Sequence, residues 1–123
     1  MNDKQMLLTV EFVDGVPMAR ILRFSGDLDS TNAEHVSEVV LSLLGEGVLH
    51  IVADFTKLRY VNSTGLGALL FANKKMKEAG GSMKIAGVNE NVFEIIEIIG
   101  ANMLLEIHRT MDDAIAALKE VAK

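Results

Sequence analysis

The chain has 123 residues, which is the length of one domain, and half of them are hydrophobic, so an intrinsically disordered chain is excluded. It carries 17 acidic and 12 basic residues, and the net charge of −5 argues against a nucleic-acid binder, which usually presents a basic face. The absence of cysteine excludes disulfides, thiolate zinc sites and cysteine nucleophiles.

The sequence also lacks the signals that direct a chain into or across a membrane. It contains no run of about 18 consecutive apolar residues, so it predicts no membrane-spanning helix. Its first four residues lack the basic region and the long apolar stretch of a signal peptide. We therefore expect a cytoplasmic protein without membrane insertion, in which residues 1–123 form a single domain.

Two β-strands joined by a tight turn are expected to open the chain. The segments 5–13 and 16–24 are apolar and rich in strand-forming residues, and Asp14-Gly15 separates them. Asp-Gly is typical of a two-residue type I′ turn, in which both central residues need a positive φ. The pattern predicts an antiparallel hairpin, with Pro17 just after the turn, where a missing N–H costs least.

A helix and a buried strand are predicted next. Thr31 can cap the helix, and Glu34 completes a capping box. Gly45 and Gly47 end the helix. The apolar run 48–55 then predicts a central strand that is covered on both faces. The apolar residues that share one face of the helix are Val36, Val39, Val40 and Leu43.

The second half of the chain is expected to alternate helices with short strands. A second helix begins near Ser63 or Thr64 and stops at Gly80-Gly81, before a strand over 83–86. The residues expected on its buried face are Leu66, Leu69, Leu70, Asn73 and Met76.

Two more helices complete the predicted fold. Asn89 or Asn91 caps the third helix, and Gly100 ends it. A short edge strand over 104–108 follows, and Thr110 then caps the last helix. Their expected buried residues are Val92, Ile95, Ile96, Ile99, Ala114, Leu118 and Val121. The order ββαβαβα(β)α requires parallel pairing, which predicts an α/β domain with a mixed sheet of four to five strands and about four helices.

The turn from Asn62 to Gly65 is the most informative stretch for function. The strand before it is expected to end at Phe55, and a short connection then leads to two hydroxyls, Ser63 and Thr64, at the start of a helix. Sites in α/β proteins usually lie at the carboxyl ends of strands, and a helix N-terminus stabilises an anion. From the residues alone, the alternative is that Asn62 or Ser63 is simply an N-cap.

Catalytic and metal-binding interpretations fail on spacing. A P-loop needs lysine after its last glycine, but Ala68 follows Gly67. A nucleophile elbow needs glycine two residues before its serine, but Val61 stands there. We therefore expect no enzyme and no catalytic residue. We also expect no metal or other cofactor, because the three histidines show no ligand spacing: His35, His50 and His108.

The segment from Tyr60 to Gly67 resembles the signature of the STAS domain family, the bacterial anti-sigma factor antagonists, which usually have Asp-Ser-[Ser/Thr/Ala]-Gly-Leu-Gly. Gly26-Asp27-Leu28-Asp29 resembles the Gly-[Glu/Asp]-[Leu/Ile]-Asp of the family, and residues 51–55 resemble its Ile-Val-Leu-Asp-Leu strand. Because these landmarks occur in the right order along essentially the whole chain, the resemblance implies one STAS-like domain.

The resemblance also implies a mechanism. Family members bind an anti-sigma factor that is itself a serine kinase of the histidine-kinase-like ATPase type, and this binding frees the sigma factor. Phosphorylation, which falls on Ser63 by position, breaks the complex, and a PP2C-type phosphatase resets it. Thr64 is a candidate secondary acceptor, but it is at least as well explained as an ordinary residue of the first helical turn. The implied partner-binding residues are Asp29, Asn62, Ser63, Thr64, Gly65, Leu66 and Gly67. Asp29 is equally well explained as a helix-capping residue.

Asn62 stands where the family most often has aspartate, so it can cap a helix but supplies no negative charge beside Ser63. A phosphate adds about −1.5 to −2 charges, which a helix N-terminus tolerates and an interface that had buried the neutral serine does not. Two other classes of function remain open: an unphosphorylated adaptor subunit of a transporter or signalling complex, and a small-ligand or nucleotide binder.

Overall fold

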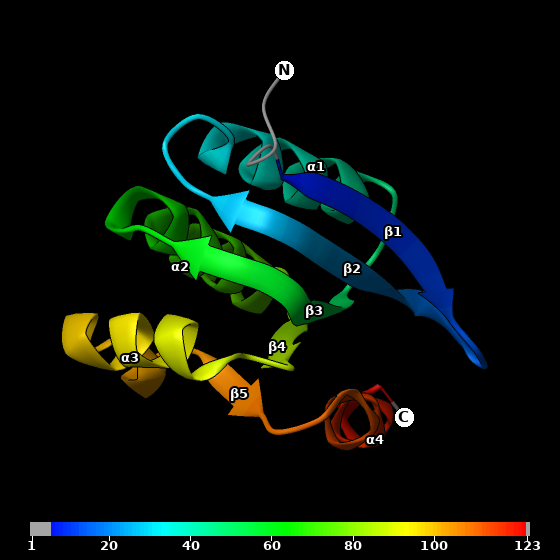
Figure 1. The fold of residues 1–123 in the computed structure, drawn as a ribbon. Helices are drawn as coiled ribbons and strands as arrows, with labels where there is room; N and C mark the ends of the chain where they lie inside the picture. Colours follow the sequence, from blue (N-terminus) through cyan, green and yellow to red (C-terminus); the bar gives the residue numbers. More distant parts are fainter. Residues whose placement is uncertain (1–5, 123) are drawn as a thin grey trace.

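The computed structural model describes residues 6–122, and it confirms the predicted α/β class and element order (Figure 1). The strands are β1 (Leu7–Val13), β2 (Val16–Leu28), β3 (His50–Val61), β4 (Ser82–Ala86) and β5 (Glu106–His108). The helices are α1 (Ala33–Gly45), α2 (Ser63–Glu78), α3 (Glu90–Ile99) and α4 (Met111–Val121), with a short 3₁₀ helix, η1 (Ala101–Met103), that the sequence analysis did not foresee. The start of the first predicted strand, at Gln5, lies outside the described residues.

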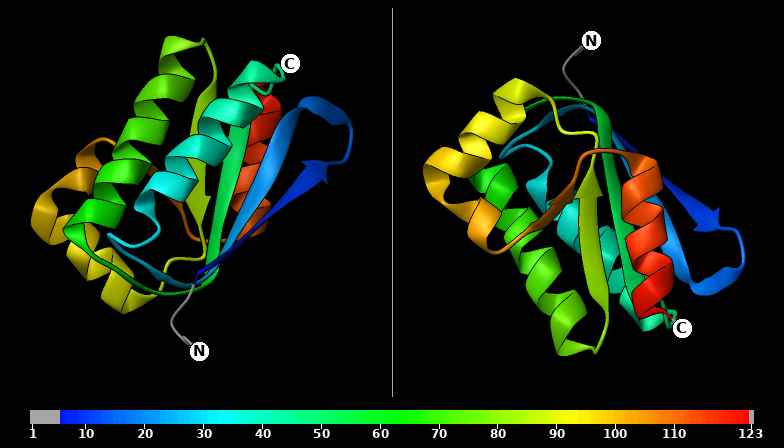
Figure 2. Two further views of the ribbon diagram at one scale, coloured as in Figure 1. Left: turned by 90° about the horizontal axis from the view of Figure 1, so that it is seen from above. Right: turned by 90° about the horizontal axis from the view of Figure 1, so that it is seen from below.

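The five strands form one mixed sheet in the order β1-β2-β3-β4-β5. β1 pairs antiparallel with β2, and the remaining neighbours pair parallel. α1 and α2 cover one face of the sheet and α4 lies on the other (Figure 2). β3 is therefore central and covered on both faces, as predicted. No helix within the described range has the length and apolar character that crossing a membrane requires.

β2 and β3 are both longer than predicted, and their extensions carry the candidate site. β3 does not end at Phe55 but continues to Val61, beside a β2 that continues to Leu28. Polar residues in 56–60 suggested a loop, but Leu58 and Val61 are buried and hold the segment in the sheet. Register shifts between the two strands accompany the extension.

The turn between β1 and β2 differs from the predicted type I′ turn. Gly15 has a φ of 78°, but no residue other than glycine has a positive φ in the described chain, so Asp14 does not meet the type I′ requirement. A register shift between Phe12 and Val13 accompanies the turn, which is typical of a β-bulge. The antiparallel hairpin itself is confirmed.

The helix caps follow the predictions except at α1. Asn89 and Thr110 cap α3 and α4 through their side chains, as expected. Thr31 does not cap α1, because its hydroxyl donates to Asp29 and Asn32 takes the N-cap position without a capping hydrogen bond. The predicted capping box is therefore wrong.

Most residues of the predicted helix faces are buried, and the two that are exposed lie at helix ends. Ile99 and Val121 are 47% and 54% exposed, which corrects the prediction for both. Each is the last residue of its helix, beyond the last buried residue of that helix, so helical spacing alone places it inward although no core remains to receive it. The partly buried members are Val39, Leu70 and Ile95.

Candidate functional site

The carboxyl ends of β2 and β3 lie side by side and form the base of the candidate site. Leu28 pairs with Val61, and the backbone N–H of Asn62 donates to the Leu28 carbonyl at 3.2 Å. The loop that begins at Asp29 and the helix that begins at Ser63 therefore leave the sheet next to each other (Figure 1). The fold thus brings together two of the three segments on which the resemblance rests, Gly26–Asp29 and Tyr60–Gly67.

Asn62 is the N-cap of α2. Its extended backbone turns the chain into the helix, and its Oδ1 accepts a hydrogen bond from the Gly65 N–H at 2.9 Å. Its carbonyl accepts from the Leu66 N–H, also at 2.9 Å. Of the two N-cap candidates, Asn62 therefore takes this role, and Ser63 becomes the first residue of the helix.

Ser63 and Thr64 are both exposed in the first turn of the 16-residue helix α2. The first N–H groups of a helix have no intrahelical acceptor, and together with the helix dipole they place about half a positive charge at this end. An enzyme can reach either hydroxyl, and the helix end can hold an anion on either one.

Gly65 and Leu66 lie beneath this surface. A Cβ on Gly65 would be 2.7 Å from the carbonyl oxygen and from the Cγ of Leu28, so only glycine fits there. Leu66 is 1% exposed. The structure therefore keeps these two expected partner-binding residues inside the molecule. Gly67 is exposed, with no atom within 4 Å of an added Cβ, so it is open to a close approach from outside.

Asp29 shapes the loop between β2 and α1. Its Oδ1 accepts hydrogen bonds from the hydroxyl and the backbone N–H of Thr31, at 2.6 and 2.9 Å. The bond from the Thr31 hydroxyl and then the one from its N–H lower the pKa of Asp29, so the group is a carboxylate at neutral pH. The Asp29 carbonyl accepts from the N–H groups of Asn32 and Ala33, which anchors the start of α1.

Tyr60 is a surface feature near the site that the sequence analysis missed. It lies at the end of β3, two residues before Asn62, and is 46% exposed. The neighbouring Arg59 lies 3.4 Å from Asp27 on β2 and so ties the two strand ends together. The sequence did contain a signal for this, because the apolar residues Leu58 and Val61 lie three positions apart. Once β3 extends this far and both are buried, the two residues between them face solvent.

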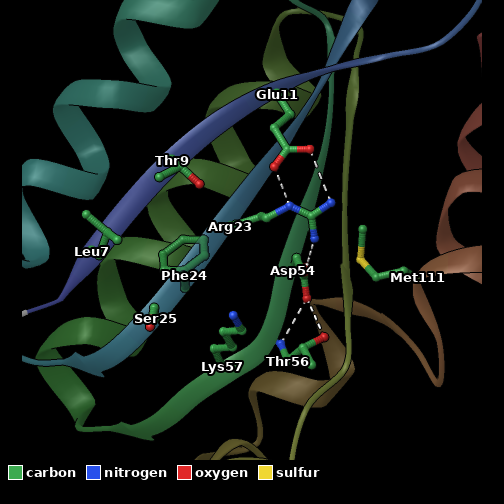
Figure 3. Close-up of a pocket in the computed structure, with 10 residues that line it drawn as sticks. All are labelled: Leu7, Thr9, Glu11, Arg23, Phe24, Ser25, Asp54, Thr56, Lys57 and Met111. Carbon is green, nitrogen blue, oxygen red and sulfur yellow. Dashed lines mark hydrogen bonds and ion pairs between the residues drawn. The ribbon is translucent and has the colours of Figure 1, made fainter.

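A second feature is a groove of about 560 Å³ over β1, β2 and β3 near the start of α4 (Figure 3). Arg23 lies between two carboxylates there. It bonds to Glu11, with an Nε–Oε2 distance of 2.6 Å, and to the buried Asp54. The backbone N–H and hydroxyl of Thr56 also donate to Asp54.

These contacts keep Asp54 ionised. Burial alone would raise the pKa of Asp54, but the two hydrogen bonds from Thr56 and the charge of Arg23 outweigh it, so the pKa lies below its ordinary value. The hydrogen bond and charge of Arg23 likewise lower the pKa of Glu11. The charged groups of Glu11, Arg23 and Asp54 pair with one another and so connect β1, β2 and β3. They leave little unpaired charge that could bind a ligand.

The histidines lie apart, in different surroundings. His50 is buried on β3 with its Nδ1 2.9 Å from the Ser82 hydroxyl, whereas His108 contacts Glu106 and His35 is exposed on α1. Among residues 6–122, no three side chains of the metal-binding types gather in a way that could hold a metal ion.

Comparison with known proteins places this fold and site in a family. The STAS domain model matches residues 8–114. The chain is 29% identical over 107 residues to an anti-sigma F factor antagonist of Paenibacillus polymyxa, covering 83% of this chain and 88% of the relative.

Solved structures share the fold. An anti-sigma factor antagonist from Mycobacterium paratuberculosis superposes with a TM-score of 0.83 at 19% identity, covering 96% of this chain and 97% of the other. The Bacillus cell fate determinant SpoIIAA in its phosphorylated form superposes with a TM-score of 0.68 at 18% identity, covering 90% and 98%. The chain belongs to the STAS domain family, and its relatives include anti-sigma factor antagonists.

Proposed function

We propose that this chain is an anti-sigma factor antagonist controlled by phosphorylation of Ser63. In the unphosphorylated state it binds an anti-sigma factor that carries a serine kinase of the histidine-kinase-like ATPase type, which frees the sigma factor for transcription. Phosphorylation of Ser63 by the bound kinase releases the complex, and a PP2C-type phosphatase restores the binding form. The chain itself needs no catalytic residue for this cycle, because the kinase supplies ATP, magnesium and base.

The observation that carries the proposal is the place of Ser63 in the fold. Ser63 is the first residue of α2, and its side chain is exposed. It follows the Asn62 cap directly and lies beside the loop that begins at Asp29. A relative of known structure was solved in a phosphorylated form. A phosphate here lies at the favourable end of a helix dipole, so the domain stays folded.

Release follows from the cost of burying charge. An interface that covers the neutral hydroxyl of Ser63 also excludes water from it. A phosphate at the same place would be a buried charge of about −1.5 to −2 without a partner, which is strongly unfavourable. Phosphorylation therefore acts on binding and not on the fold. Asp29, Asn62, Thr64 and Gly67 surround Ser63 on the proposed contact surface, while Gly65 and Leu66 support it from below.

The test is a phosphorylation assay with each purified anti-sigma factor kinase of the source organism. The chain is incubated with kinase, ATP and magnesium, and intact mass followed by peptide mapping locates the phosphate. We expect one phosphate on Ser63, none on the Ser63→Ala variant, and full labelling of the Thr64→Ala variant. Purified phosphorylated chain should bind the kinase at least tenfold more weakly than the unphosphorylated chain. A chain that no kinase phosphorylates on Ser63 would overturn the proposal.

A further inference from the structure

A groove of about 730 Å³ runs along α2 next to Leu104, in the segment that follows η1. Leu104 forms one wall, and its carbonyl accepts a hydrogen bond of 3.1 Å from the Asn73 side chain of α2, which fixes the wall to the helix. The residues of α2 that matter for the argument are Gly67, Leu70, Phe71, Lys74 and Lys77. This groove lies outside the residues that the sequence motifs marked, except for Gly67.

The groove lies on the same side of α2 as Ser63. Counted from Ser63, these five residues follow at four, seven, eight, eleven and fourteen positions, which is the spacing of one helix face at 3.6 residues per turn. Ser63 and the groove therefore share one side of α2, over a length of about 21 Å from Ser63 to Lys77 at 1.5 Å per residue. A partner that reaches Ser63 along α2 passes over the groove.

Gly67 lies between Ser63 and the other groove residues on this side of α2. It lies inside the helix and is exposed, its φ is not positive, and an added Cβ would meet no atom within 4 Å. Neither backbone conformation nor internal packing requires glycine here, and glycine weakens a helix relative to alanine. What glycine provides is a bare stretch of backbone between Ser63 and the groove, which another chain can approach closely.

Large apolar side chains are exposed at the groove. Phe71 is 37% exposed and Leu104 62% exposed, and Met103, next to Leu104, is 84% exposed. A large cluster of exposed apolar side chains on a protein surface usually marks a site that interacts with another molecule. The occupant of the groove must therefore bring apolar side chains.

The charge along the groove is positive. Glu78 also lines the groove, but its Oε1 lies 3.5 Å from the Nζ of Lys75, so these two charges offset each other. Lys74 and Lys77 are exposed, and neither has an ion-pair partner in the part of the chain that the structure describes. An occupant with carboxylates beside its apolar side chains complements both features.

We propose that the groove binds an apolar segment of the anti-sigma factor that is flanked by carboxylates, so that Ser63 and the groove form one continuous interface along α2. This inference rests on the proposed function, because the occupant is the same partner that reaches Ser63. The groove then supplies affinity at one end of the interface, and the phosphorylation state of Ser63 decides binding at the other. Carboxylates of the occupant within roughly 8 Å of a phosphate on Ser63 would also repel it.

The test compares groove variants with matched variants on α4, which lies on the other face of the sheet. The groove variants are the double variant Lys74→Glu/Lys77→Glu, Leu104→Ser and Gly67→Ala. The matched variants are Lys119→Glu and Val121→Ser, which change an exposed lysine and an exposed apolar residue of α4 in the same way. Binding to the purified anti-sigma factor kinase is measured by calorimetry, and the melting temperature of each variant is measured alone.

We expect each groove variant to bind the kinase at least tenfold more weakly, while the α4 variants bind within twofold of the wild type. Gly67→Ala should weaken binding although its melting temperature is unchanged or higher, which a purely structural role cannot produce. At saturating kinase the lysine double variant and Leu104→Ser should still be phosphorylated on Ser63 at the wild-type maximal rate, with a raised KM. If Leu104→Ser does not fold, the lysine double variant carries the test.

Groove variants that bind as tightly as the wild type would overturn the groove interface. If the wild-type chain is still phosphorylated on Ser63 in that experiment, the proposed function stands and only the groove fails. If the wild-type chain neither binds the kinase nor accepts phosphate, the proposed function itself fails, and the groove interface fails with it.

Discussion

Gly65 of α2 lies so close to Leu28 of β2 that a Cβ at position 65 would be 2.7 Å from the Leu28 carbonyl oxygen. This contact sets how near the first turn of α2 can approach the end of β2. It therefore places Ser63 beside the Asp29 loop. The requirement comes from space and not from backbone conformation, since φ at Gly65 is not positive.

We predict that Gly65→Ala destabilises the domain by about 1–3 kcal/mol, because the added methyl group forces backbone apart in a packed region. Gly67→Ala is the matched control: it has open space and should stabilise by about 0.5–1 kcal/mol through helix propensity. Urea denaturation of both variants measures the difference. Equal stabilities for the two variants would show that the contact with Leu28 is not restrictive.

The two asparagine caps should respond differently to aspartate. Asn62 uses its oxygen to cap α2, and aspartate keeps that bond and adds a favourable charge at the helix N-terminus. Asn89 caps α3 in the same way but also donates from its amide to the Leu58 carbonyl at 2.9 Å. A carboxylate there would face that carbonyl without a proton to donate.

We therefore expect Asn62→Asp to leave the unfolding free energy unchanged or raised by about 0.3–1 kcal/mol. We expect Asn89→Asp to lower it by about 1–3 kcal/mol, because a buried acceptor loses its donor. Chemical denaturation at pH 7 separates the two outcomes. A loss of stability in Asn62→Asp as large as that in Asn89→Asp would mean that the Asn62 amide has an essential partner.

Ser63→Asp tests whether the start of α2 tolerates negative charge. The side chain is exposed and next to the free N–H groups of the helix, so we expect stability to stay within about 1 kcal/mol of the wild type. Thermal unfolding measures this, with Ser63→Ala as the uncharged control. Unfolding of the aspartate variant under native conditions would contradict a switch that acts on binding alone.

Asp54 should contribute stability that depends on its charge. Its pKa is held below the ordinary value, so its contribution is fully present above the unfolded pKa of about 3.9 and is lost as pH falls through the folded pKa. Asp54→Asn should cost about 1–3 kcal/mol at pH 7. The difference in unfolding free energy between the variant and the wild type should become smaller below about pH 4. A difference that does not depend on pH would show that the carboxylate charge is not what stabilises β1, β2 and β3.

His50 gives a second pH dependence, nearer to neutrality. Burial, and then the charge of Lys84, lower the pKa of His50. The unfolded chain therefore binds a proton at this residue near pH 6.5, whereas the folded chain binds it only at a lower pH. Stability is therefore lost as pH falls from about 6.5 toward the folded pKa. His50→Asn should flatten the stability profile between about pH 7 and pH 5.

Local patterns in the sequence predicted most of the fold, because helices and strands follow from short-range periodicity. The stripe Val36, Val40 and Leu43 is buried, and the caps at Asn89 and Thr110 form as expected. Errors arose where distant segments decide the outcome. Residues 56–61 look like a loop in isolation and become strand only because the end of β2 pairs with them. Ile99 looks buried by spacing, but it is the last residue of its helix.

The sequence by itself determined the family and pointed to Ser63, because a short motif marks a helix start and places a hydroxyl there. Only the tertiary structure decided which residues of that motif are exposed and which are buried. Packing against Leu28 buries Gly65, and the core takes Leu66, while Gly67 stays open. The groove along α2 also needs Leu104, which is distant in sequence and arrives beside the helix only when the chain folds.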